Sequence, residues 1–112
     1  MKSQAKGRRA EIELANYLKE RGFENARPGA ALNFGTEPDI KGVDGLHIEC
    51  KRHERLEVSK WYEQSRQDAE RMQDGRPVVI YRQSRKPWFI LLELEDFIEL
   101  MQGQSPERKD NV

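Results

Sequence analysis

The chain has 112 residues, a length that suits one small domain with a single hydrophobic core. Lysine plus arginine and aspartate plus glutamate number 20 each, so the net charge is zero and the strongly basic balance of many DNA-binding domains is absent. No apolar run approaches the ~20 residues of a membrane span, so we exclude a membrane-spanning protein and predict a soluble, cytoplasmic one.

The N-terminal segment has the spacing of an amphipathic helix. Its stripe contains Glu11, Leu14, Ala15 and Leu18, at i, i+3, i+4 and i+7. A carboxylate on a stripe that faces the core needs a partner, whereas one at the rim simply reaches water. Both interpretations of Glu11 stay open, the first with a metal ion or a metal-held water as its partner.

An extended segment and a turn follow. The proline before Asp39 favours extended backbone, which sends the side chains of Asp39 and Ile40 to opposite sides. Residues 41–45, Lys-Gly-Val-Asp-Gly, are typical of a hairpin connection. We therefore predict that the next strand runs antiparallel to this segment and brings Glu49 close to Asp39.

The strand after the turn alternates apolar and polar side chains, which places the two sets on opposite faces. The apolar set is Leu46, Ile48 and Cys50, and the polar set is His47, Glu49 and Lys51. Two carboxylates at close range, Asp39 and Glu49, favour a cation between them, and oxygen ligands favour Mg²⁺ or Mn²⁺. A solvent-exposed charged face is the alternative interpretation.

Zinc and disulfide chemistry are both disfavoured. His47, Cys50 and His53 are metal-ligand types, but His47 and Cys50 face opposite sides of a strand and cannot meet one ion without a bulge. Cys50 is the single cysteine, so no internal disulfide can form, and its place in the strand predicts that it is buried.

The C-terminal half predicts a helix, two strands and a closing helix. Their ranges are Val58 to about Met72, Pro77–Arg82, Trp88–Leu94 and Glu95–Met101. The continuous apolar run from Trp88 to Leu92 predicts a strand buried on both faces. Glu95 and Asp96 suit the first turn of a helix because of its dipole. We predict one domain over residues 1–102 and a mobile polar tail over 103–112.

These motifs, in their order and spacing, resemble the PD-(D/E)XK nuclease superfamily, and within it the archaeal-type Holliday junction resolvases and their phage and bacterial relatives. The matching pieces are Lys6–Leu14, Gly22-Phe23, Pro38-Asp39-Ile40 and Ile48-Glu49-Cys50-Lys51. The resemblance implies an α/β fold with a restriction-endonuclease-like αβββαβ core, in which helices flank a mixed central sheet. It also implies a homodimer, because small relatives pair to cut two strands.

The resemblance further implies an endonuclease that hydrolyses DNA phosphodiester bonds with Mg²⁺ or Mn²⁺. Its catalytic residues would be Glu11, Asp39, Glu49 and Lys51. Asp39, Glu49 and the main-chain carbonyl of Cys50 would bind the ion, and Lys51 would orient the water or neutralise charge. Gln64 is a weaker candidate for an accessory role. The residues expected to contact DNA are Lys6, Arg8, Arg9, Arg27, Arg52 and Arg55.

The DNA structure that the protein would act on stays open. Ile12 stands where the resolvases often have arginine, and the loop over residues 28–36 lacks the serine that they place there. Branched DNA, such as Holliday junctions, and linear duplex are both candidate substrates. A non-catalytic DNA-binding or assembly subunit is the competing class, although such a subunit has no reason to keep Asp39, Glu49 and Lys51 together.

Overall fold

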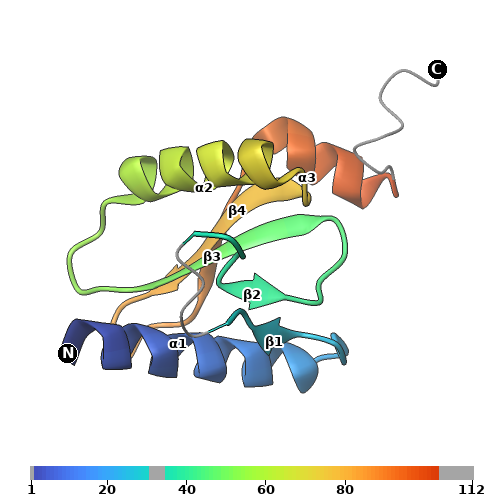
Figure 1. Ribbon diagram of the computed structural model, residues 1–112. Helices are drawn as coiled ribbons and strands as arrows, with labels where there is room; N and C mark the ends of the chain where they lie inside the picture. The colour runs from blue at the N-terminus through green and yellow to red at the C-terminus, as the bar shows by residue number, and fades with distance from the viewer. Residues whose placement is uncertain (1, 31–34, 104–112) are drawn as a thin grey trace.

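The computed structural model describes residues 2–30 and 35–103, with side chains from residue 6 onward (Figure 1). Its elements are α1 (Lys2–Lys19), β1 (Arg27–Pro28), β2 (Ile40–Lys41), β3 (Leu46–Arg52), α2 (Val58–Met72), β4 (Arg76–Arg82), β5 (Phe89–Leu91) and α3 (Leu94–Met101). This order contains the predicted αβββαβ succession and continues with one strand and one helix. Apart from Gly103, the predicted tail lies outside the described residues.

The strands form one mixed sheet in the order β1-β2-β3-β4-β5. β3 and β4 pair in parallel along seven residues, and the other neighbours pair antiparallel. Parallel neighbours need a long crossover connection, which α2 provides here. α1 covers one face of the sheet, and α2 lies on the opposite face with α3 beside it (Figure 1). The predicted α/β fold with a mixed, helix-flanked sheet is confirmed.

The main core lies between α1 and the sheet. Its buried members are Ala10, Leu14, Ala15, Ile40, Ile48, Cys50, Val78 and Ile80. The predicted apolar stripe of the first helix is thus confirmed, and so is the burial of Cys50 on the same face of β3 as Ile48. The predicted turn after β2 is also present, with Gly42 and Gly45 at φ of 89° and 87°, angles that side-chain-bearing residues rarely adopt.

α2 has the predicted bounds and packs through a narrow face. Trp61, Ser65 and Ala69 are its buried residues, so Trp61 is part of the core. The Ser65 hydroxyl donates a hydrogen bond to the carbonyl of Val78 at 3.1 Å, so this buried polar group is satisfied and ties α2 to β4.

The prediction that the last strand is buried on both faces was wrong. β5 is three residues long and forms an edge of the sheet, where Phe89 and Ile90 are 51% and 52% exposed. An edge strand has a neighbour on one side only, so even apolar side chains keep contact with water unless another element covers them. A continuous apolar run therefore did not distinguish a central strand from an edge.

α3 is attached to the domain through its acids. Asp96 and Glu99 are buried against Arg76 of β4, which is itself 4% exposed. The Arg76 guanidinium lies 3.2 Å from Glu99 Oε1 and 3.8 Å from Asp96 Oδ1. Asp96 does lie in the first turn of α3, as predicted, but it also takes part in a buried ion cluster that the sequence pattern did not reveal.

We expect Arg76→Met to lower the free energy of unfolding by ~3 kcal/mol, because it leaves two buried carboxylates without their guanidinium. Urea denaturation measures this loss. Arg66→Met is the matched control, since Arg66 pairs with Glu63 at an exposed site and its loss should cost less than ~1 kcal/mol. Equal losses in the two variants would contradict the assigned role of the buried cluster.

Candidate active site

Asp39 lies directly before β2, where its side chain takes over from a strand as hydrogen-bond partner of β3. Ile40 is opposite Ile48, and the Asp39 N–H donates to the Ile48 carbonyl at 3.0 Å. Further along β3, the Cys50 N–H donates to Asp39 Oδ2 at 2.8 Å. Because the N–H and C=O of a strand residue point to the same edge, the Cys50 carbonyl also lies on the edge of β3 that faces Asp39.

Glu11 of α1 approaches the same carboxylate. It lies within hydrogen-bonding reach of Asp39 and is partly buried. Arg8, one turn earlier, places its Nη1 3.4 Å from Glu11 Oε1 and donates to the Gly29 carbonyl at 2.6 Å. The backbone at Gly29 also lies close to that of Pro38. Only a glycine fits there, because a Cβ at residue 29 would overlap the carbonyl oxygen of Pro38.

The site concentrates negative charge away from water. Burial and the neighbouring Glu49 and Glu11 carboxylates raise the pKa of Asp39 to about 8, against the smaller opposing effects of the Cys50 N–H and Lys51. Burial also raises the pKa of Glu11, although Asp39 and Arg8 partly offset it. The positive charges of Arg8 and Lys51 therefore do not offset the negative charge of Glu11, Asp39 and Glu49.

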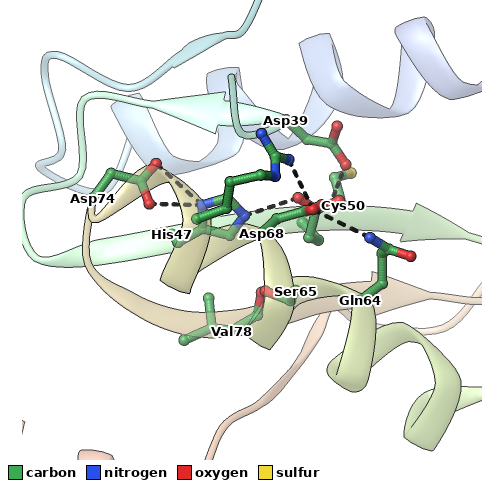
Figure 2. A network of polar contacts seen from close by, with 10 residues as sticks. Asp39, His47, Cys50, Gln64, Ser65, Asp68, Asp74 and Val78 are labelled. Atoms are coloured by element: carbon green, nitrogen blue, oxygen red, sulfur yellow. Dashed lines mark hydrogen bonds and ion pairs between the residues drawn. The ribbon is translucent and has the colours of Figure 1, made fainter. Parts of the chain in front are cut away.

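Glu49 is held by a buried histidine, His47, which also contacts Asp74 (Figure 2). His47 Nε2 lies 3.0 Å from Glu49 Oε2, and His47 Nδ1 lies 2.9 Å from Asp74 Oδ1. Burial lowers the pKa of His47, but the hydrogen bond with Glu49 and the charge of Asp74 outweigh it, so the net pKa is raised. The His47 side chain is fully buried. The polar face of β3 is therefore not a solvent-exposed one.

A second acid, Asp68 of α2, lies beside this pair. Gln64 Nε2 donates to Asp68 Oδ1 at 3.2 Å (Figure 2). Arg71 Nη2 donates to the same oxygen at 2.9 Å. Ligand atoms of His47, Glu49 and Asp68 lie within 4.8 Å of one another, the only such group of three or more metal-ligand side chains among the described residues. All three side chains have protein partners, since His47 contacts Asp74 and Glu49, and Asp68 accepts from Gln64 and Arg71; the contact with His47 holds Glu49 in position.

Cys50 and His53, two of the zinc-ligand types noted in the sequence, have surroundings different from those of His47. Burial, followed by the charge of Asp39, raises the pKa of the Cys50 thiol far above its usual value, so the thiol stays protonated and is a poor nucleophile. The His53 ring lies 5.3 Å from the Trp61 ring. In the part of the chain that the structure describes, His53 and Cys50 join no group of metal-ligand side chains.

The structure brings the four predicted catalytic residues together. Glu11, Asp39 and Glu49 converge from α1, the start of β2 and β3, and the charge of Lys51 also acts on Asp39. Gln64 is exposed and reaches Asp68 rather than the three carboxylates. Sequence reasoning missed the contributions of His47, Asp68 and Asp74; the i, i+2 spacing of His47 and Glu49 was the one available signal.

The predicted DNA-contacting residues divide into two groups. Lys6, Arg9 and Arg55 are exposed, and Arg52 is partly buried. Hydrogen bonds from Ser84 lower the pKa of Glu54 and the charges of Lys6 and Arg52 add to this effect, so the N-terminal part of α1 and the end of β3 approach the same acid. Arg8 and Arg27 are instead engaged with main-chain carbonyls, those of Gly29 and Asn25.

A carboxylate cluster with a lysine on the central strands of an αβββαβ core defines the PD-(D/E)XK class of proteins. The chain belongs to the family described as "Phage putative PDDEXK endonuclease", whose model matches residues 2–110. No curated protein and no solved structure gave a significant match. Within the described residues, no helix combines the length and the apolar character needed to cross a membrane.

We expect Asp39→Asn to stabilise the metal-free protein at alkaline pH. A carboxyl whose pKa rises from 3.8 to about 8 on folding favours the folded state below 3.8, and this advantage is lost as the pH rises through 8. The amide oxygen of the Asp39→Asn variant can still accept the hydrogen bond from the Cys50 N–H. The melting temperature in EDTA should therefore exceed that of the wild type by at least ~5 °C above pH 8, with the difference shrinking towards pH 4.

Glu37→Gln is the control with the opposite sign. The Ala30 N–H donates to Glu37 at 2.8 Å and lowers the pKa of this carboxyl. Its replacement should leave the melting temperature unchanged or lower it. A destabilised Asp39→Asn protein at alkaline pH would show that Asp39 is not under electrostatic strain.

Proposed function

We propose that the protein is a divalent-metal-dependent DNA endonuclease and that Glu11, Asp39, Glu49 and Lys51 form its active site. The observation that carries this proposal is the anchored Asp39 carboxylate, which has a raised pKa and lies beside two further acids and a lysine. A binding module would gain nothing from this arrangement, because the buried repulsion costs stability. The family description supports the same activity.

The donor set fits a hard divalent cation. Asp39 and Glu49 offer carboxylate oxygens and Cys50 offers its main-chain carbonyl on the Asp39 edge of β3, a set of oxygen ligands that suits Mg²⁺ or Mn²⁺. When bound, such an ion polarises the phosphate and lowers the pKa of a coordinated water. Asp39 and Glu49 would hold the ion, and the Cys50 N–H fixes the direction of the Asp39 carboxylate.

Lys51 is the residue that acts on the attacking water or on the phosphate. It lies on the same face of β3 as Glu49, two residues along, and is partly buried. Its ammonium has three donors, which can orient a water or neutralise charge on the phosphate oxygens as they gain it. Glu11 supports the same site from α1, with Arg8 limiting the carboxylate's motion. His47 positions Glu49 from within the protein.

DNA would enter over the basic region at the start of α1 and the end of β3. Lys6, Arg9, Arg52 and Arg55 are the residues we assign to phosphate contacts, while Arg8 and Arg27 act mainly within the protein. Contacts of this kind are independent of sequence and weaken as salt is added. Branched DNA, including Holliday junctions, is the substrate that the resemblance favours, and homodimer formation and cytoplasmic location remain predictions.

Cleavage assays with Mg²⁺ or Mn²⁺ test the proposal. Asp39→Asn, Glu49→Gln and Lys51→Met should each lower kcat by ~100-fold or more, because each removes charge that the transition state uses. DNA affinity should change little. Glu63→Gln is the matched control, since Glu63 is an exposed acid of α2 that pairs with Arg66 and lies outside the catalytic set. The same divalent ions should raise the melting temperature of the wild type but not of Asp39→Asn.

The panel of substrates separates the competing interpretations. Four-way junctions, flaps, linear duplex and single strands are compared at equal concentration. Preference for the junction supports a resolvase-like specificity, and equal cutting of linear duplex supports a general endonuclease. DNA binding with no cleavage of any substrate, together with no metal-dependent stabilisation, would instead identify a non-catalytic subunit.

A further inference from the structure

Four aromatic rings form a continuous row at one end of the sheet. The ring of Trp61 lies 5.3 Å from that of His53 and 5.9 Å from that of Tyr81, measured between centroids. Tyr81 lies 5.9 Å from Phe89, and these two rings are stacked with 28° between their planes. Trp61 is buried, Tyr81 is partly buried and Phe89 is 51% exposed. From Trp61, the row therefore leads out of the core to a ring that is half open to water.

The row begins beside the candidate active site. Lys51 of β3 is opposite Tyr81 of β4, and Tyr81 is opposite Phe89 of β5. Paired residues of neighbouring strands direct their side chains to the same face of a sheet, here the face on which Trp61 of α2 packs. Two interstrand spacings, about 10 Å in all, separate Phe89 from Lys51 along this row. A nucleotide whose phosphate reaches Lys51 thus brings its own base or the next one close to Phe89.

The segments that flank the row carry cationic side chains. Arg85 and Lys86 lie between β4 and β5, Arg55 follows β3, and all three are exposed. Ser84 Oγ donates to Glu54 Oε2 at 2.7 Å, so these two segments lie side by side. Residues 53–55 and 83–88 contain these three cations and one acid, Glu54, and are therefore net positive. Aromatic rings that stack on bases, next to cations that attract phosphates, are the combination that binds unpaired nucleotides.

We propose that Phe89, held in place by Tyr81, stacks on an unpaired base of the DNA substrate close to the phosphate that is cut. This inference rests on the proposed endonuclease function and adds a requirement on the substrate. Bases inside a duplex stack on one another and present only their edges in the grooves. The ring of Phe89 therefore needs a base that has left the stack, as in a flap, at a branch point or in a single strand.

Exposure alone does not distinguish Phe89. Ile90, the next residue, is 52% exposed on the opposite face of β5, as expected of a sheet edge. What distinguishes Phe89 is its stacking on Tyr81 and its place in line with Lys51. A ring that is already fixed by a neighbouring ring loses little conformational entropy when a base stacks on it. A role in packing alone would be met equally well by an aliphatic side chain, which the experiment below exploits.

Fluorescence anisotropy in EDTA tests the proposal, because binding is then measured without cleavage. The probes are a labelled single strand, a flap and a linear duplex of the same sequence. Phe89→Ala and Phe89→Leu should each weaken binding of the single strand and the flap by at least ~10-fold, and binding of the duplex by less than ~2-fold, since both variants lose the aromatic face. Phe89→Tyr keeps that face and should bind like the wild type.

Ile90→Ala and Phe23→Ala are the matched controls. Ile90 tests the same strand on its other face, and Phe23 is a 47% exposed phenylalanine that follows α1. Both variants should bind every probe with wild-type affinity. All of these variants should keep the circular dichroism of the wild type, because each replaced side chain is about half exposed.

Three results would overturn the stacking proposal: wild-type affinity of Phe89→Leu for the single strand and the flap, an equal loss of affinity for all three probes, or no binding of the single strand and the flap by the wild type. The endonuclease function is judged separately, by cleavage with divalent ions. Metal-dependent cleavage with unaltered binding by the Phe89 variants would remove only the stacking role. Loss of single-strand and flap binding in these variants, in a protein that cuts no DNA, would support the stacking role and contradict the endonuclease function.

Discussion

The burial of Asp39 beside Glu11 and Glu49 is the constraint on which the site depends. A carboxylate out of water is unfavourable, and two more at close range make it worse, which is why the pKa of Asp39 rises to about 8. The fold nevertheless keeps the group in place, because Cys50 donates its main-chain N–H where β2 no longer pairs with β3. The arrangement costs stability in the free protein, a cost that the proposed bound cation would offset.

The rest of the domain supports this unfavourable cluster. The seven-residue parallel pairing of β3 and β4, with α2 as the crossover, holds Glu49 and Lys51 on a strand with hydrogen-bonded neighbours. α1 brings Glu11 to the site because the apolar residues around it pack into the main core. His47, held by Asp74, fixes the Glu49 carboxylate from behind. Rigid elements, rather than loops, thus supply the charged groups.

Much of this could be predicted from the sequence because it follows from local periodicity. The alternation along β3 gave the shared face of Glu49 and Lys51, and the spacing within α2 gave its bounds. Partners far apart in the chain were not predictable in the same way. The His47–Asp74 contact joins residues 27 positions apart. Arg76 lies 23 positions before Glu99, and its contact with this acid places Glu99 on the buried side of α3. The exposure of β5 likewise depends on strand order, which an apolar run does not encode.

Proton release on metal binding tests the central claim most directly. If Asp39 is largely protonated in the free protein at neutral pH and binds the ion as a carboxylate, Mn²⁺ binding at about pH 7 must release about one proton, and almost none at about pH 10. Calorimetric titrations in buffers of different ionisation enthalpy measure this number, with Asp39→Asn as the control that should release none. Tight Mn²⁺ binding without proton release at neutral pH, or no binding at all, would contradict the account.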